Sequence, residues 1–185
     1  MRKINIFKSL LVVLVFSLII FIFGCKTPTP EPPKYDVAYI NEKLDATGFT
    51  SYFYQKTIKS GEIILLEENT NVSLKDGKYL VKTEILKLNT IDNQTKYDVQ
   101  ENEEEVEIAE DPIKLSLKES DFNDVQVSEN SLTGNVKDDA NILGFSVKNL
   151  NLKINLNNSK VSNIELSYTD VETNLIVKVI VKYNY

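Results

Sequence analysis

The chain has 185 residues, a formal net charge of −6, no histidine, and Cys25 as its only cysteine. An acidic chain without a clustered basic stripe is unsuited to nucleic acid, and histidine is the residue that most often binds transition metals and moves protons near neutral pH. A single cysteine allows no intramolecular disulfide. We therefore expect no nucleic-acid partner, no metal and no cofactor, and a fold held together by apolar burial and backbone hydrogen bonds.

Residues 1–24 have the pattern of an export signal. The basic residues of this segment are Arg2, Lys3 and Lys8. They precede an apolar run, residues 10–24, whose length of about 15 residues fits a signal-peptide core and is short of the roughly 20 needed to cross a bilayer. Cleavage after this segment would remove three positive charges and no negative ones, so the mature chain would be more acidic than the whole.

The apolar run ends in Ile22, Phe23, Gly24 and Cys25, with an aliphatic residue three positions before the cysteine and a small residue directly before it. This ending resembles the lipobox of bacterial lipoproteins, although that family usually has alanine, serine or threonine where Phe23 stands. The resemblance implies a diacylglyceryl group on the Cys25 sulfur and cleavage after Gly24. The expected location is then the outer face of the bacterial plasma membrane, or the outer membrane if the host has two membranes.

Two other interpretations of the segment are an uncleaved membrane helix and an ordinary signal peptide that leaves Cys25 as a free thiol. The apolar run is short for the first. The second would leave an exported protein with a reactive thiol that has no intramolecular partner. We therefore prefer lipidation, because the basic n-region, the length of the apolar core and the position of the cysteine all agree with it. Two acyl chains would then hold the protein on a membrane far more firmly than one.

Residues 25–34 join the lipidated cysteine to the rest of the chain and contain four of the five prolines. Such a stretch favours extended polyproline II, at about 3.1 Å per residue, and would act as a spacer above the membrane. Residues 35–185 are enough for one domain with its own core and too few for two ordinary domains. We expect a single β-rich domain there.

Residues 36–46 contain the one helix that the sequence predicts. Val37, Ile40 and Leu44 have helical spacing, and Asp36 suits the N-cap position. The expected fold class is mainly β (α+β): this amphipathic helix, followed by an antiparallel meander that forms a curved sheet or half-open β-barrel.

From residue 51 onward the apolar pattern has the period of two that is typical of strands. Strands are expected near residues 51–58, 62–67, 71–75, 78–88, 96–99, 103–108, 113–118 and 124–127. Asp76 and Gly77 form a two-residue hairpin signal that would place Leu74 opposite Tyr79.

Residues 143–185 predict a three-stranded antiparallel meander. If four residues connect its last two strands, Tyr168 faces Leu175 and Leu166 faces Val177, on one apolar face. A further hairpin is expected between residues 103–108 and 113–118.

Residues 98–111 contain eight carboxylates and no basic residue. A calcium site would need six to eight oxygens around one point, usually from a glycine-containing loop, and no such pattern occurs. In an extended strand Glu101, Glu103, Glu105 and Glu107 would lie along one face, which spreads the charge. We therefore interpret this stretch as the solvated face of a strand.

The sequence contains no pattern that predicts an enzyme. Many glutamates are close enough in sequence to form the acid pair of a glycosidase, but none is marked as buried in a cleft. There is no nucleophile motif of the Gly-x-Ser-x-Gly or Ser-x-x-Lys type and no phosphate-binding loop. We expect a non-enzymatic protein.

One helix followed by many antiparallel strands, in an exported lipoprotein of this size, resembles the half-open barrels of lipoprotein carriers and of mycobacterial lipid-binding lipoproteins. The resemblance implies an apolar cavity between the sheet and the helix of residues 36–46. Candidates to line it are Tyr52, Tyr54, Tyr79 and Phe145.

Two hypotheses about function stay open on the sequence alone. In the first, the domain binds a lipid or another apolar ligand in such a cavity. In the second, the aromatic side chains fill an ordinary core, and the protein is an adhesin, a display protein or a structural lipoprotein.

Overall fold

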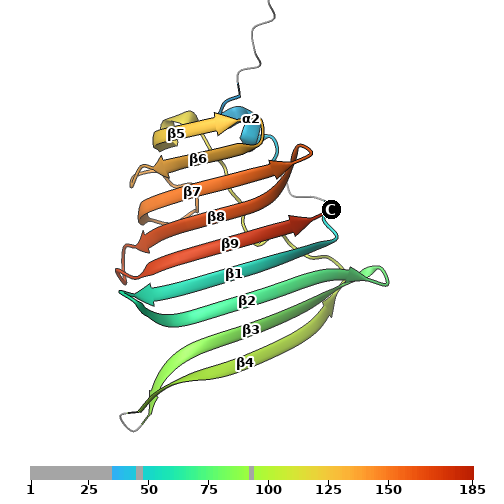
Figure 1. The fold of residues 1–185 in the computed structure, drawn as a ribbon, viewed down its shortest axis with the longest axis vertical. Helices are drawn as coiled ribbons and strands as arrows, with labels where there is room; N and C mark the ends of the chain where they lie inside the picture. Colours follow the sequence, from blue (N-terminus) through green and yellow to red (C-terminus); the bar gives the residue numbers. More distant parts are fainter. Residues whose placement is uncertain (1–34, 45–47, 92–93) are drawn as a thin grey trace, which may run out of the picture. The chain divides into compact units, whose positions relative to one another are not determined.

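The computed structural model describes residues 35–44, 48–91 and 94–185, which belong to one compact unit, Tyr35–Tyr185. The signal peptide, Cys25 and the proline-rich linker lie outside the described residues. Nine strands form one antiparallel sheet in the order β4-β3-β2-β1-β9-β8-β7-β6-β5 (Figure 1). The sheet is not closed, since β4 and β5 are its two edges. The expected antiparallel β fold is therefore confirmed.

The elements, in chain order, are the helix α2 (Val37–Asn41), β1 (Ser51–Ser60), β2 (Ile63–Lys75), β3 (Lys78–Ile91), β4 (Gln94–Val106), the short 3-10 helix η1 (Glu119–Asp121), β5 (Phe122–Ser128), β6 (Ser131–Val136), β7 (Val147–Asn157), β8 (Lys160–Asp170) and β9 (Ile176–Asn184).

The helix α2 is much shorter than the amphipathic helix expected over residues 36–46. Asp36 does cap it, since its carboxylate accepts a hydrogen bond from Tyr39 N at 2.9 Å. The helix ends at Asn41, whose side-chain oxygen accepts a hydrogen bond from Leu117 N at 2.8 Å. Val37 and Ile40 are buried. The helix has only five residues, and its two buried side chains pack into the core. It is too short to extend across the sheet.

The first four strands form a meander. The hairpin at Asp76 and Gly77 is confirmed, with Leu74 opposite Tyr79. Both turn residues have positive φ, 52° and 81°, as this type of tight hairpin requires. The strands expected near 62–67 and 71–75 are one long strand, β2, and those expected near 96–99 and 103–108 are both part of β4.

The last three strands form the expected meander with a different register. Tyr168 pairs with Val177 and Leu166 pairs with Val179, a shift of two residues from the prediction. The connection between β8 and β9 is five residues long, not four, and Asn174 adopts a positive φ of 56° within it. Because side chains alternate with a period of two, this shift leaves the same side chains on the apolar face.

The predicted hairpin of residues 103–108 with residues 113–118 is wrong. β4 pairs with β3, so that Val106 lies opposite Tyr79. Residues 107–118, which we call the crossing segment, form no strand and run behind the sheet from the end of β4 toward β5 (Figure 1). The segment connects the two edges of the sheet, because β4 and β5 are consecutive in sequence and are at opposite ends of the strand order.

The two faces of the sheet differ in burial. The face that we call the inner face includes Leu152, Leu166 and Val179 and contains the buried core of strands β5 to β9. The opposite, outer face carries polar side chains on the same strands. β3 and β4 contribute no buried side chain among their described residues. The core therefore lies under one half of the sheet, and the β2–β4 half extends beyond it.

Candidate functional site

The crossing segment covers the part of the inner face next to β1, β8 and β9. Leu117 is 4 % exposed within the core, and Ile113 and Leu115 pack against the core with partial burial. Its backbone is attached to the helix through the Leu117 N–Asn41 Oδ1 hydrogen bond described above. The part of the sheet where a carrier would hold its ligand is therefore occupied by the chain itself.

A hydrogen bond between Tyr183 and Asp111 attaches the middle of this segment to the sheet. The Tyr183 hydroxyl donates to Asp111 Oδ1 at 2.5 Å, and Ile113 N donates to the same oxygen at 3.1 Å. Burial, and then the hydrogen bond and charge of Asp111, raise the pKa of Tyr183 above its ordinary value. A neutral tyrosine and a carboxylate therefore hold the segment against β9.

Tyr52 and Tyr79, two of the four predicted pocket residues, belong to an aromatic cluster. Their rings lie 5.3 Å and 5.8 Å from the Phe49 ring, and Tyr183 completes the group at 6.0 Å from Phe49. The Tyr79 hydroxyl donates to the Phe49 carbonyl at 3.2 Å. Rings at these separations are in packing contact, so the cluster is core structure at the end of the sheet.

Tyr54 and Phe145, the other two predicted residues, do line a hollow. It measures about 210 Å³ and also touches Tyr168, whose ring lies 5.9 Å from that of Phe145. The ammonium-bearing side chains of Lys56 and Lys114 contribute to its wall. Burial raises the pKa of Tyr54 to about 12, with a smaller contribution from nearby Glu68. The volume is below the 300–1,000 Å³ that is typical of ligand pockets.

A second hollow, of about 340 Å³, lies beside the helix. Its lining includes Asn41, Leu44, Asp111 and Ser116 and none of the four predicted residues. The structure therefore divides the predicted residues between a packed aromatic cluster and a small hollow, and the space near the helix is lined by other side chains.

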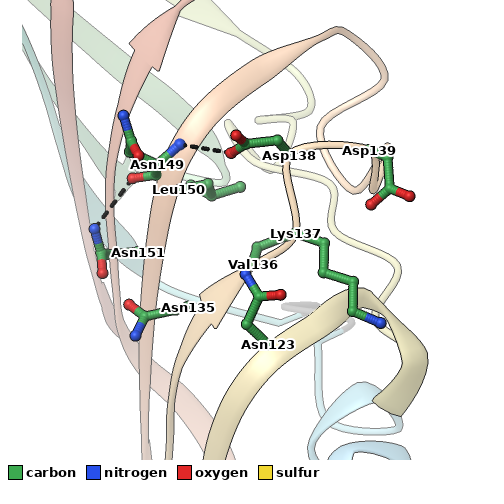
Figure 2. A pocket seen from close by; sticks show the side chains of 9 residues that line it. All are labelled: Asn123, Asn135, Val136, Lys137, Asp138, Asp139, Asn149, Leu150 and Asn151. Carbon is green, nitrogen blue, oxygen red and sulfur yellow. Dashed lines mark hydrogen bonds between the residues drawn. The ribbon is translucent and has the colours of Figure 1, made fainter.

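The largest hollow described is polar and lies at the ends of β6 and β7 (Figure 2). It measures about 560 Å³. Its polar lining consists of Lys137 and of Asn123, Asn135, Asp138, Asp139, Asn149 and Asn151.

Several of these groups are engaged in local hydrogen bonds. Asp138 accepts from Asn149 N at 2.9 Å, and the Asn151 side chain donates to the Asn149 carbonyl at 3.1 Å, as the dashed lines in Figure 2 show. Lys137 Nζ donates to the Ser120 carbonyl at 2.8 Å. These contacts hold the loop after β6 in place, and we assign no chemistry to this hollow.

The outer face carries amide, hydroxyl and charged side chains across the sheet. One row of paired residues runs from Gln55 through Asn69 and Glu84 to Glu101. Gln55 donates to Asn69 at 3.0 Å, and the Asn69 amide donates to Glu67 at 3.1 Å. This polar face is solvated sheet surface, and it does not enclose a small apolar ligand.

The acidic strand β4 lies at the edge of the sheet and is solvated, as expected. Its carboxylates are exposed except for Asp98, which is half-buried. Lys82 pairs with Glu103 at 2.9 Å, and Lys78 pairs with Glu107 at 3.2 Å. Within the described part of the chain, no group of three or more acidic or cysteine side chains is arranged to hold a metal ion.

No protein-family model matches the chain, and a comparison with curated proteins finds no relative. Over the residues that the structure describes, no helix is long and apolar enough to cross a membrane. The predicted lipidation site, Cys25, lies outside the described residues.

Sequence reasoning missed the crossing segment. The alternation of Ile113, Leu115 and Leu117 with polar residues predicted a strand, but an extended chain buried on one side has the same period without strand partners. The available signal was Pro112, which has no backbone N–H to donate to a sheet ladder and often ends regular pairing.

Proposed function

We propose that the protein is a lipid-anchored, non-enzymatic surface protein of a bacterium, which works by presenting its exposed sheet to a macromolecular partner outside the cytoplasm. Lipidation of Cys25 would hold it on the outer face of the plasma membrane, or on the outer membrane of a host that has two. The proline-rich linker, residues 25–34, would separate the domain from the membrane surface.

The observation that carries this proposal is the occupied inner face. Leu117 is buried, and the Asp111–Tyr183 hydrogen bond attaches the segment to β9. The two hollows that the segment lines measure only about 210 Å³ and 340 Å³, and polar or charged side chains contribute to both. A carrier would need this space for its ligand. The outer face, in contrast, exposes rows of polar side chains, such as the row from Gln55 to Glu101.

The amino-acid composition of the chain supports a binding function more than an enzymatic function. The chain has no histidine, and its only arginine, Arg2, belongs to the expected signal peptide. The carboxylates of β4 are spread along a strand, which is unlike the convergent arrangement of an acid–base pair. The second candidate function is binding of a lipid in an enlarged form of the hollow at Tyr54 and Phe145. The following experiment distinguishes this function from display.

A photo-crosslinking side chain placed at either of two positions on intact cells tests the proposal. Glu84 is exposed on the outer face beside β4, and Ile113 lines the hollow at Tyr54 and Phe145. We expect macromolecular adducts from position 84 and only intramolecular products from position 113. Lipid adducts from position 113, without macromolecular adducts from position 84, would support the carrier function and reject display.

A further inference from the structure

β4 is an edge strand. It pairs with β3 along one edge, and its other edge has no strand partner among the described residues. It runs over 13 residues, Gln94–Val106, and it pairs with β3 without any shift in register. Figure 1 shows it at one end of the sheet. In such a strand every second residue directs its backbone N–H and C=O groups away from the sheet, where another extended chain can bind them.

The two edges of the sheet differ in how they are protected against pairing with another strand. β5 has only seven residues, and its pairing with β6 shifts between Phe122 and Asp124. Short length, bulges, prolines and charged side chains are common means of preventing edge pairing. β4 is long and regular and contains no proline, so its charged side chains are what opposes pairing. Strand addition at β4 therefore requires a strand whose charges complement those of β4.

The side chains of β4 on the outer face form a two-part pattern. Tyr97 and Val99, which are 47 % and 58 % exposed, lie on the same face as Glu101, Glu103 and Glu105 because side chains alternate along the strand. The Tyr97 hydroxyl reaches across the sheet and donates to the Ile64 carbonyl at 3.0 Å, so its ring is held in position. One half of the edge is apolar and the other half is acidic.

The acidic half is only partly neutralised by the sheet. Glu101 lies directly opposite Glu84, and like charges in this position are destabilising. Glu105 lies opposite Leu80, and only Glu103 has an ion pair, with Lys82. A strand that brought basic side chains to this edge would relieve the repulsion and satisfy the backbone groups together.

The charge and composition of each candidate strand indicate whether it can pair with β4. Antiparallel pairing with β4 of a second copy, centred on Glu103, would place glutamates against glutamates. Centred on Gln100, the same pairing would place Glu101 and Glu103 against Val99 and Tyr97, so these glutamates would still have no basic partner. The β5 edge of a second copy carries Asp124 and no basic residue. The chain's own linker, residues 25–34, has four prolines and therefore lacks the backbone N–H groups that a ladder needs.

We propose that β4 binds an extended segment of another protein by strand addition, and that this segment has alternating basic side chains followed by alternating apolar ones. The proposal rests on the display function proposed above and names the surface and partner chemistry. In the antiparallel orientation, the basic residues would come first and face Glu105 and Glu101, and the apolar residues would follow and face Val99 and Tyr97. Main-chain hydrogen bonds would supply affinity and the side chains specificity.

A matched set of synthetic peptides tests this binding mode on the full-length lipidated protein in non-ionic detergent. The probe alternates lysine with threonine and then valine with threonine, and spans Tyr97 to Glu105. One control peptide has glutamate in place of lysine, and another has N-methyl groups on alternate amides, which removes ladder hydrogen bonds. Charge reversal by Glu101→Lys with Glu105→Lys is compared with Asp124→Lys on the distant β5 edge. Fluorescence anisotropy at physiological salt measures Kd.

We expect the lysine–valine probe to bind saturably. N-methylation and the double charge reversal should each weaken it by about tenfold or more, while Asp124→Lys should change it little. The glutamate peptide should bind only the double variant, which also shows that this variant is folded. No saturable binding up to about 1 mM, or binding that N-methylation leaves unchanged, would overturn the proposal. Neither result depends on whether lipid occupies the inner face. Failure of strand addition at β4 can therefore be distinguished from failure of the display function.

Discussion

The Asp170 carboxylate organises the turn between β8 and β9 by accepting three hydrogen bonds. They come from the Thr173 hydroxyl at 2.7 Å, from Thr173 N at 2.8 Å and from Glu172 N at 3.1 Å. The side-chain bond from Thr173, and then the backbone bonds, lower the pKa of Asp170 below its ordinary value. With Asn174 in the left-handed region, this turn sets the register of the last hairpin. Asp170 and Asn174 thus stabilise the turn that connects the two paired strands.

Gly134 is required by close packing, not by its backbone angles. A Cβ atom at this position would lie 2.7 Å from Phe122 Cδ1 and 2.9 Å from the Asp124 carbonyl oxygen. We expect Gly134→Ala to destabilise the domain by about 1–3 kcal/mol, because the aromatic ring and the neighbouring strand must both move. Urea unfolding measures the change. Thr133→Ala, on the exposed side of the same strand, is the matched control, and an equal effect of both substitutions would contradict this interpretation.

Tyr54 should make the stability of the domain depend on alkaline pH. Its folded-state pKa is about 12, against 10.0 for an unperturbed tyrosine. Between these values the unfolded state binds fewer protons than the folded state, so stability is complete below pH 10 and falls as pH rises toward 12. Urea unfolding of the wild type and Tyr54→Phe at pH 8 and pH 11 tests this. We expect a smaller loss in the variant, and equal losses would be inconsistent with the raised pKa.

At the scale of elements, the crossing segment converts an open sheet into a half-covered one. It contributes no strand, yet it covers the inner face and is held at two points, by Asn41 through Leu117 N and by Tyr183 through Asp111. The same segment links the two edges of the sheet, so that β4 and β5 do not pair with each other. One edge of β4 therefore has no strand partner among the described residues. The element that fills the apolar face thus also accounts for the free edge.

The two ends of this segment should differ sharply in their effect on stability. Leu117 is 4 % exposed, so Leu117→Ala should lower the free energy of unfolding by about 2–5 kcal/mol. Ile108 is 79 % exposed, and Ile108→Ala should change it by less than about 0.5 kcal/mol. Chemical denaturation of both variants provides the measurement. A small effect at Leu117 would mean that the segment is not part of the folded core.

Local rules predicted the elements that are defined by their own residues. The Asp76–Gly77 hairpin and the three-stranded meander at the C-terminus follow from turn chemistry and alternation, and both are present. Two features depend on distant contacts and could not be predicted this way. One is the pairing of β1 with β9, such as Tyr54 opposite Val181, which joins the two meanders. The other is the path of residues 113–118.

The candidate site was predicted only in part for a similar reason. The aromatic residues Tyr52, Tyr54, Tyr79 and Phe145 all belong to the inner side of the fold or its cover, but alternation cannot show which ones share a hollow. That depends on where the crossing segment lies. Tyr54 and Phe145 flank the space next to Pro112 and Ile113, whereas Tyr52 and Tyr79 pack with Phe49.

At the scale of the whole molecule, we expect a lipid anchor at Cys25 to hold the domain at a membrane surface. Its attachment should depend on one sulfur. We expect Cys25→Ser to abolish incorporation of labelled fatty acid, because the chain has no second cysteine to accept the lipid. Metabolic labelling followed by immunoprecipitation measures this, with Thr27→Ser as the matched control. Normal labelling of the Cys25 variant would refute the lipoprotein assignment.

We expect the domain to act through its surface, because its own chain covers the apolar side of the sheet. Native mass spectrometry of the lipidated protein, purified from the membrane of its own host in mild detergent, tests this expectation. The expected mass is that of the mature polypeptide with its covalent anchor and nothing further. A stoichiometric, non-covalently held lipid that is lost on denaturation would contradict it.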